Sequence, residues 1–221
     1  MRKLLAVLCL FLPWPLRRAI FRGVFKYEIG DGARIGLSLI YAKKLILKPG
    51  ARIGHLNICK DIDLVELGES ASIGNLNWIT GFPSGMRGHF EHQTDRKPEL
   101  VLGSHAAITN RHLVDCTASI HIGAFATFAG FASQLLTHSI NLETSRQEAY
   151  PITIGEYCFV STNCVLLGGS ALPPCSVLGA KSLLNRAYND RYHLYGGVPA
   201  KPIKPLPENT AYFHRKVGYV K

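Results

Sequence analysis

Histidine is the side chain of this chain best suited to acid–base chemistry, because an imidazole can gain or lose a proton close to neutral pH. His138 lies in a stretch without regular aliphatic residues, and His89 and His92 lie three residues apart in a second such stretch. Two histidines at that spacing can belong to a metal site, but no third ligand accompanies them, so we expect no metal. Taken alone, His138 would be interpreted as an ordinary surface histidine.

Cysteine is the other reactive side chain, and its spacing argues against a chemical role. The six cysteines form no Cys-x-x-Cys pair and show no zinc-ligand spacing. Cys158 and Cys164 fall at positions of a repeat that hold small residues. The simplest interpretation is that they are buried and act as small hydrophobic residues, which is compatible with a reducing compartment.

A six-residue repeat sets the elements that must position these residues. From Ile154 onward an aliphatic residue stands at every sixth position, and a small residue follows each of the first five by four positions. Neither a helix nor an isolated strand has this period. A parallel β-helix does, because its flat faces turn at regular corners. The aliphatic positions are Ile154, Val160, Leu166, Leu172, Leu178 and Leu184, and the small ones are Cys158, Cys164, Ser170, Ser176 and Ser182.

The same spacing begins near Ile29 and is interrupted twice. Residues 81–100 carry Gly, Pro, His and charged residues in place of aliphatic ones, and residues 134–153 form the second interruption. Insertions of this length in a repeat are expected to be surface loops with a functional role. The predicted organisation is a basic and apolar helical segment at 1–28, an all-β parallel β-helix at 29–186 with these two loops, and a C-terminal extension at 187–221.

Length and composition describe a single globular domain with an uneven charge. The chain has 221 residues, of which 47% are hydrophobic and 18% charged, which is enough to bury a core and excludes a disordered chain or a coiled coil. Residues 1–60 hold twelve Lys or Arg and two acidic residues, whereas residues 61–221 hold thirteen of each sign. The net charge of +10 therefore belongs to the N-terminal end. No recognition motif for nucleic acid accompanies it, so we expect no nucleic-acid partner.

The N-terminal segment combines this charge with the apolar run Leu4–Leu12, which Pro13 follows. The run is about half the roughly 20 apolar residues that a membrane-spanning helix needs, and no A-x-A-like cleavage site of a signal peptide follows before Arg17. Two interpretations stay open. Residues 1–26 could form an amphipathic helix that lies on an anionic membrane, or a short helix that caps the open end of the β-helix. One segment could do both.

Four further motifs follow one another along the chain: Thr137-His138-Ser139, Pro151–Gly155, Leu178–Ser182 and Gly197–Lys201. Together with the hexapeptides they resemble the hexapeptide-repeat acetyltransferases, in the branch that contains galactoside, maltose and surface-polysaccharide O-acetyltransferases, over about residues 29–206. The resemblance implies a left-handed β-helix, an exception to the usual right-handed crossover. It also implies a homotrimer that binds acetyl-CoA, a co-substrate, in clefts between neighbouring subunits.

Within this resemblance, His138 matches the catalytic histidine of the family. A sugar hydroxyl is a poor nucleophile at neutral pH, and an imidazole can take its proton as it attacks the thioester. The tetrahedral oxyanion then collapses and expels the CoA thiolate. No covalent acyl-enzyme is implied, so the cysteines need not react.

The resemblance assigns further residues to the two substrates. Asn110 and Asp115 match positions that contact the acceptor sugar, although Asn and Asp are also common turn residues at a corner. Glu148 is expected near the acceptor, where it could orient the ring of His138, as a carboxylate does in other base–orienter pairs. The residues expected to bind acetyl-CoA are Phe159, Thr162 and Ala180 along the acetyl and pantetheine end and Arg186, Lys201 and Lys204 near the phosphates.

The sequence therefore predicts a cytoplasmic O-acetyltransferase that moves acetyl from acetyl-CoA to a sugar hydroxyl of a surface-polysaccharide or lipid-linked glycan precursor. The N-terminal charge points to work at the inner face of the membrane, and the loop Arg87–His92 suits recognition of a large glycan. The alternatives are N-acetylation of an amino-sugar nucleotide, a non-catalytic β-helix scaffold, and a metalloenzyme resembling the γ-type carbonic anhydrases. The last needs three converging histidines, a spacing that the repeat does not offer.

Overall fold

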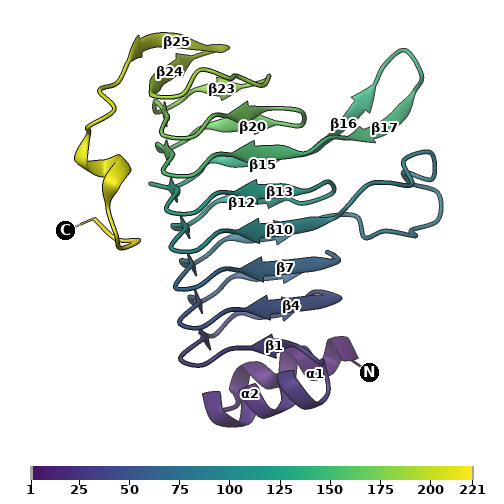
Figure 1. Ribbon diagram of the computed structural model, residues 1–221. Coiled ribbons are helices and arrows are strands. Elements are labelled where there is room, and N and C mark those ends of the chain that lie inside the picture. The colour runs from purple at the N-terminus through teal and green to yellow at the C-terminus, as the bar shows by residue number, and fades with distance from the viewer. Residues whose placement is uncertain (1, 221) are drawn as a thin grey trace.

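A stack of triangular coils forms the centre of the molecule (Figure 1). The computed structural model describes residues 2–220. Met1, the first residue of the predicted segment 1–28, and Lys221, the last residue of the predicted segment 187–221, lie outside the described residues. Three parallel sheets form the faces of the coils, helices cover one end, and the C-terminal segment returns along one side. The parallel β-helix predicted from the six-residue repeat is confirmed.

Each regular coil contributes one short strand to each sheet. Sheet A contains β1 (Glu28–Ile29), β4 (Lys44–Leu47), β7 (Leu64–Leu67), β10 (Glu99–Leu102), β13 (Ile120–Ile122), β18 (Ile152–Ile154) and β21 (Ala171–Leu172). Sheet B contains β2 (Arg34–Ile35), β5 (Arg52–Ile53), β8 (Ser72–Ile73), β11 (Ala107–Ile108), β14 (Thr127–Phe128), β19 (Phe159–Val160), β22 (Val177–Leu178), β24 (His193–Gly197) and β25 (Ala200–Pro205). Sheet C contains β3 (Leu39–Tyr41), β6 (Ile58–Lys60), β9 (Trp78–Thr80), β12 (Leu113–Asp115), β15 (Gln134–Leu136), β20 (Val165–Leu167) and β23 (Leu183–Leu184).

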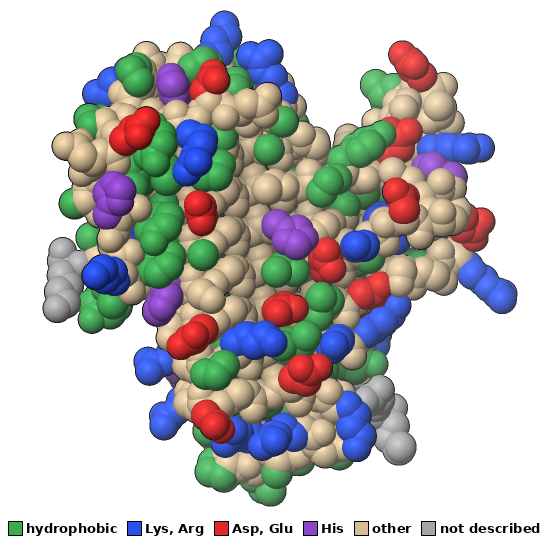
Figure 2. Space-filling view, in the orientation of Figure 1, with side chains coloured by type: hydrophobic (Ala, Val, Ile, Leu, Met, Phe, Trp, Pro, Cys, Tyr) green, Lys and Arg blue, Asp and Glu red, His purple; other side chains and the backbone are tan. Residues whose placement is uncertain are grey.

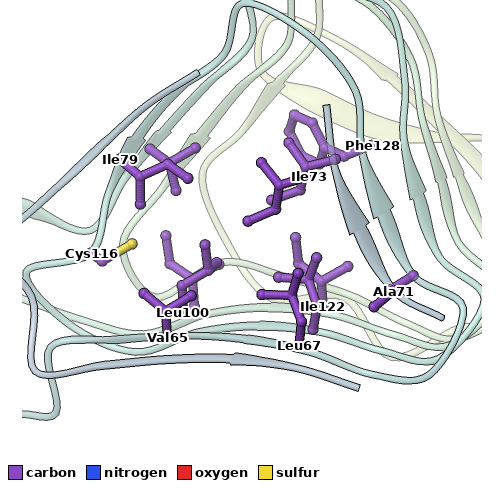
Figure 3. Packing of buried hydrophobic residues seen from close by; sticks show 14 of the residues in the cluster. Val65, Leu67, Ala71, Ile73, Ile79, Leu100, Cys116, Ile122 and Phe128 are labelled. Atoms are coloured by element: carbon purple, nitrogen blue, oxygen red, sulfur yellow. The ribbon is translucent and has the colours of Figure 1, made fainter. Parts of the chain in front are cut away.

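The aliphatic positions of the repeat fill the interior of the coils. From Ile154 to Leu184 all six are at most 2% exposed, and the five small residues between them are equally buried. Figure 3 shows side chains of neighbouring coils, such as Val65 and Leu100, pointing into the same interior space. Burying one such side chain contributes about 1.5–3 kcal/mol, so every coil stabilises the next.

All six cysteines are buried and free. Burial raises the pKa of the Cys59 and Cys158 thiols to about 12. At neutral pH these thiols are uncharged, and an uncharged thiol is a poor nucleophile. The packing role predicted for Cys158 and Cys164 agrees with their place in the interior.

Two insertions project from the same side of the β-helix (Figure 1). Residues 81–98 lie between β9 and β10, close to the predicted bounds. The second insertion is narrower than predicted and is not irregular: it is an antiparallel hairpin of β16 (His138–Asn141) and β17 (Arg146–Ala149). Gln134 belongs to the coil, because one extra residue at the preceding corner moves the inward position after Phe128 to Leu135.

The N-terminal residues cover the open end of the first coil, as one of the two interpretations expects. Where one short helix is predicted, the chain forms α1 (Arg2–Leu8), the 3-10 turn η1 (Cys9–Phe11) and α2 (Trp14–Gly23). Cys9 and Phe21 pack into the main core. Arg17, only 2% exposed, donates from Nη2 to the Gly36 carbonyl at 2.9 Å. Among residues 2–220, no helix has the length and apolar character needed to cross a membrane.

The C-terminal segment closes the opposite end and then returns along sheet B (Figure 1). β24 and β25 pair antiparallel, and a 3-10 turn, η2 (Ala211–His214), follows. Tyr212 donates its hydroxyl to the Cys158 carbonyl at 3.2 Å, and the Arg215 guanidinium binds the Phe125 carbonyl. Because Cys158 and Phe125 belong to successive coils, the segment fastens these coils together from outside.

Candidate active site

The corner between sheets C and A carries an imidazole and a carboxylate in direct contact. β12 ends at Asp115, and β15, which pairs with it, ends at Leu136 directly opposite. The chain leaves the coil immediately afterwards, so His138 begins the hairpin above Asp115. The distance between His138 Nδ1 and Asp115 Oδ2 is 2.7 Å. The stacking of two coils therefore brings together residues that are 23 positions apart.

Hydrogen bonds hold Asp115 in its charged form. Its Oδ2 accepts the backbone N–H groups of Thr137 and His138 at 3.0 and 3.1 Å, and its Oδ1 accepts the hydroxyl of Thr117 at 2.5 Å. The side chain is buried. Burial by itself raises the pKa of Asp115, but the hydrogen bonds from His138, Thr117 and Thr137 outweigh it, and the pKa lies below its usual value.

The contact with Asp115 also settles which nitrogen of His138 is available. Because Nδ1 faces a carboxylate, it must carry the hydrogen, and in the neutral ring Nε2 then keeps a lone pair. Within residues 2–220 no hydrogen-bond partner contacts Nε2, and the side chain is 33% exposed. The hydrogen bond to Asp115 raises the pKa of His138, whereas burial and the positive charge of Arg96 lower it; the net direction is upward.

Two phenylalanines of the 81–98 insertion wall the imidazole. The ring centroids of Phe82 and Phe90 lie 5.5 and 6.0 Å from that of His138, both edge-on. The insertion is tied to the hairpin, since Gln93 donates to the Ala149 carbonyl at 3.2 Å and accepts the Ala149 N–H at 2.9 Å. Between the two insertions lies a groove of about 600 Å³, lined by Gly88, His89, Phe90, Glu91, His92, Ser145, Arg146 and Gln147.

Glu148 does not take the orienting position suggested for it. Its carboxylate accepts hydrogen bonds from Asn141 Nδ2 at 3.0 Å and from the Tyr150 hydroxyl at 2.9 Å. In the hairpin register Glu148 faces Ser139, while His138 faces Ala149. The carboxylate that contacts His138 is that of Asp115, which was expected to contact the acceptor. The sequence carries no local signal for this exchange, because it arises from the pairing of β12 with β15.

Asn110 lies at a different corner of the coil. It follows β11 and precedes β12, so it stands between sheets B and C, whereas His138 stands between C and A. Its Oδ1 accepts the Asn75 N–H at 2.7 Å and Asn75 Nδ2 at 3.1 Å. Within one subunit, sheet C therefore separates Asn110 from His138.

Of the residues expected to bind acetyl-CoA, Thr162 and Ala180 lie at the Asn110 corner, Phe159, Lys201 and Lys204 lie on sheet B, and Arg186 lies at the corner between sheets C and A, where His138 also lies. Phe159 faces outward from sheet B, edge-on to Tyr212 at 5.8 Å, and lines a groove of about 750 Å³ beneath residues 217–220. Thr162 and Ala180 stand at the corner between sheets B and C in successive coils, and Thr162 donates to the Phe131 carbonyl at 3.0 Å. The three expected phosphate ligands are exposed near the C-terminal end of the stack: Arg186, Lys201 and Lys204.

Three residues around His138 carry no motif that would have marked them: Arg96, Thr117 and Gln93. Arg96 binds the carbonyls of Phe82 and Thr117, and its Cζ lies 4.5 Å from the centre of the Phe90 ring. His89 and His92 line the groove, and among residues 2–220 no three His, Cys, Asp or Glu side chains are arranged to hold a metal ion.

Comparison with known proteins identifies the fold. No family model and no curated protein sequence matches the chain. The solved structure of the polySia-specific acetyltransferase NeuO matches it with a TM-score of 0.58 and 17% identity, over 81% of both chains. The chain shares its fold with this acetyltransferase. This confirms the predicted fold class, a left-handed parallel β-helix.

Two further structures are similar to the chain with lower scores. The polysialic acid O-acetyltransferase OatWY matches with a TM-score of 0.48 and 15% identity, over 84% of this chain and 94% of that one. A hexapeptide-repeat acetyltransferase from Vibrio cholerae O1 biovar eltor, in complex with acetyl coenzyme A, matches with a TM-score of 0.42 and 16% identity, over 94% of this chain and 86% of that one.

Proposed function

We propose that this protein is an acetyl-CoA-dependent O-acetyltransferase that acetylates a sugar hydroxyl of a surface-polysaccharide or lipid-linked glycan precursor. The observation that carries the proposal is the 2.7 Å hydrogen bond from His138 Nδ1 to an ionised Asp115, which leaves Nε2 available as a base. The fold supports it, because NeuO, which shares the fold, is named as an acetyltransferase specific for polySia.

The chemistry needs one proton to move twice. Neutral His138 takes the hydroxyl proton at Nε2 while the sugar oxygen bonds to the thioester carbonyl carbon, a contribution of about 10²- to 10⁴-fold to the rate. The negative charge of Asp115 stabilises the imidazolium that forms. The tetrahedral intermediate then collapses, the C–S bond breaks, and the departing CoA thiolate takes the proton from His138. The cysteines take no part, because their thiols are buried.

A homotrimer would complete this site. One of the two outward columns of sheet C is apolar in all but one position, and Trp78 and Leu113 in it are 48% and 42% exposed. This column consists of Leu39, Ile58, Trp78, Leu113, Gln134, Val165 and Leu183. Packing this face around a threefold axis would bury it. The corner of one subunit that holds Asn110 would then meet the corner of its neighbour that holds His138.

The same arrangement accounts for the two substrates. Acetyl-CoA would follow the corner between sheets B and C, with its thioester near Phe159 and its phosphates near the exposed Lys201 and Lys204. Arg186, at the corner between sheets C and A, would reach the phosphates from the neighbouring subunit. The glycan would lie between the 81–98 insertion and the hairpin of the neighbouring subunit, where Phe90 and Arg146 line the groove. Asn110 would contact the acceptor across the subunit boundary.

The outer face of the N-terminal cap supports peripheral contact with the cytoplasmic face of an anionic membrane. A cap needs a polar outer surface to remain soluble, yet Leu4, Leu8 and Phe11 are 64%, 52% and 83% exposed. Figure 2 shows hydrophobic side chains at this lower end of the molecule, with Lys and Arg side chains around them. Arg22 and Lys26 are among the exposed cations there. Such a surface fits the interface of an anionic bilayer, where each cation contributes about 1 kcal/mol.

Membrane contact is tested with the full chain and intact cap. We expect the protein to sediment with vesicles containing anionic lipid, and the variant Leu4→Ser/Leu8→Ser/Phe11→Ser to stay in solution. The control Val198→Ser/Ile203→Ser removes exposed apolar side chains at the opposite end, 73% and 60% exposed, and should sediment like the wild type. Equal binding of the wild type and the triple variant would show that the cap does not bind membranes.

The activity itself is tested with acetyl-CoA, a thiol reagent and a panel of glycan acceptors. We expect thiol release that depends on one class of glycan, and His138→Ala should lower turnover about 10²- to 10⁴-fold. Mass spectrometry of the product distinguishes an ester from the amide that an N-acetyltransferase would form. Wild-type turnover by His138→Ala would exclude this residue as the base, and the absence of acetyl-CoA binding would favour a scaffold.

A further inference from the structure

Arg96 stands at the base of the 81–98 insertion, where the chain has left the β-ladder. The carbonyls of Phe82 and Pro83 therefore lack a strand partner, and a carbonyl shielded from water needs another donor. The guanidinium supplies it: Nη1 donates to Phe82 at 2.5 Å, and Nη2 donates to Pro83 at 3.3 Å. Nη1 also donates to the Thr117 carbonyl of the next coil. One planar fork thus joins the insertion to the coil beside it.

Three of the residues that Arg96 contacts touch the catalytic pair. Thr117 donates its hydroxyl and its N–H to Asp115 Oδ1. The Phe82 ring packs edge-on against His138. Phe90, whose ring centre lies 4.5 Å from Arg96 Cζ, packs against His138 from the same insertion. Arg96 therefore reaches both members of the pair through their immediate neighbours and bonds to neither.

The geometry leads to one inference, which rests on the proposed function of His138. We infer that Arg96 is the positioning residue of this site: it locks the aromatic wall of the 81–98 insertion and the Thr117 support of Asp115 into one rigid frame around the imidazole. A planar group with several donors is required, because three carbonyls in different directions must be satisfied together.

The charge of Arg96 gives this frame a second effect. The titratable and charged groups nearest His138 are Asp115 on β12, Arg96 and His89 on the insertion, and Glu148 on β17. The same two insertions also carry Arg87, Glu91, His92, Asp95, Lys97, Glu143 and Arg146. The hydrogen bond to Asp115 raises the pKa of His138, and the positive charge of Arg96 opposes it. A base must be unprotonated before it can act, so Arg96 favours the active form of His138.

Two substitutions separate the frame from the charge. Arg96→Lys keeps the charge and loses the fork, so we expect turnover to fall about 10- to 10²-fold, because small misplacements of a catalytic group cost that much, while the pKa of His138 changes little. Arg96→Gln loses both, so turnover should fall at least as far and the pKa of His138 should rise. Lys97→Gln removes one exposed charge from the same insertion and is the matched control.

The measurements are an NMR titration of His138 in the full-length protein and the pH dependence of acetyl transfer. The NMR titration does not depend on enzymatic activity. If the wild type were inactive on every acceptor, the proposed function would be refuted, and the titration would still show whether Arg96 acts on His138. The inference would be overturned if Arg96→Gln gave the same His138 pKa and the same pH dependence of acetyl transfer as Lys97→Gln. If Arg96→Gln does not fold, Arg96→Lys decides it, since wild-type turnover by a folded Arg96→Lys would also overturn the inference.

Discussion

The two corners that flank sheet C use polar side chains in different ways. At the corner between sheets B and C, inward side chains form a continuous ladder from coil to coil. Asn77 N–H donates to Asn57 Oδ1 at 2.9 Å, His112 N–H donates to Asn77 Oδ1 at 2.9 Å, and Ser133 N–H donates to His112 Nδ1 at 3.3 Å. Every side chain in this ladder accepts a backbone N–H of the coil above. The ladder is therefore closed to a ligand.

The corner between sheets C and A begins with the same device. Asp115 accepts backbone N–H groups of Thr137 and His138 in the coil above. Here, however, the chain leaves the coil, and the His138 side chain folds back onto the carboxylate at 2.7 Å instead of continuing the stack. Among the described residues, none forms a hydrogen bond with Nε2 as a result. A polar group becomes available for chemistry where an insertion interrupts the ladder.

The histidines of the two corners, His112 and His138, differ in protonation because only His138 has a carboxylate beside it. His112 is 2% exposed, and no carboxylate in the described part of the chain contacts it, so burial lowers its pKa to about 4. His138 is partly exposed and bonded to Asp115, which raises its pKa. His112 is therefore neutral throughout the physiological range, whereas His138 can exchange a proton.

Replacing the carboxylate should have the largest effect on this contrast. Asp115→Asn should lower turnover about 10²- to 10⁴-fold, because the imidazole loses the partner that orients it and stabilises its charged form. Without that hydrogen bond the pKa of His138 falls, so the acidic limb of the rate profile should move to lower pH. Glu143→Gln, an exposed carboxylate at the hairpin tip, is the control. An unchanged acidic limb in Asp115→Asn would mean that Asp115 does not act on His138.

Acid should weaken the fold through His112. Its pKa is about 4 in the folded chain against 6.5 when free, so the unfolded state binds more protons between these values. The free energy of unfolding should therefore decrease as the pH falls from about 6.5 to about 4, by about 3 kcal/mol in total. His138 contributes in the opposite direction: its stabilisation is complete below pH 6.5 and is lost as the pH rises through its raised pKa. Denaturant unfolding of the wild type and His112→Gln at pH 7 and pH 4 measures how far the free energy of unfolding falls between the two pH values. An equal fall in both proteins would refute the prediction.

Removing a rung of the closed ladder should affect stability and leave the chemistry intact. Asn77→Ala removes the acceptor of the His112 N–H and the donor to the Thr109 carbonyl. Each unsatisfied buried group costs about 1–3 kcal/mol, so we expect the free energy of unfolding to fall by about 2 kcal/mol, with turnover per folded molecule within about twofold of wild type. Asn75→Ala, which removes an exposed side chain at the same corner, should cost less. A large loss of turnover at unchanged stability would contradict the contrast between the corners.

Mixing inactive subunits tests whether the two corners meet across subunits. Asn110→Ala and His138→Ala each damage one half of the proposed composite site. In trimers reassembled from equal amounts, about one site in four would combine an intact His138 with an intact Asn110 of a neighbour. Activity of the mixture should exceed that of either variant several-fold. No gain over the two separate variants would indicate that the site lies within one subunit.

The regular part of the molecule could be predicted because its signal is local. A residue at every sixth position faces the interior whatever the neighbouring coils contain, so the periodicity from Ile154 to Leu184 predicts the burial that is observed. The same rule failed at Gln134, because one extra residue at a corner shifts the count. The two interruptions of the period correspond to the two insertions that project from the β-helix, and the catalytic role that the resemblance in motif order gives to His138 stays a prediction.

The partners of His138 could not be predicted, because they depend on which residues of different coils share a corner. Asp115 comes from the coil below, and Phe82, Phe90 and Arg96 come from an insertion that folds back over that corner. The distance between two residues along the sequence does not show whether they share a corner. Residues stacked in neighbouring coils are separated by about one coil of chain, and an insertion adds an arbitrary further length. The repeat alone therefore specified the β-helix and its core, while the stacking of coils assigned the carboxylate to Asp115, the frame to Arg96 and a separate corner to Asn110.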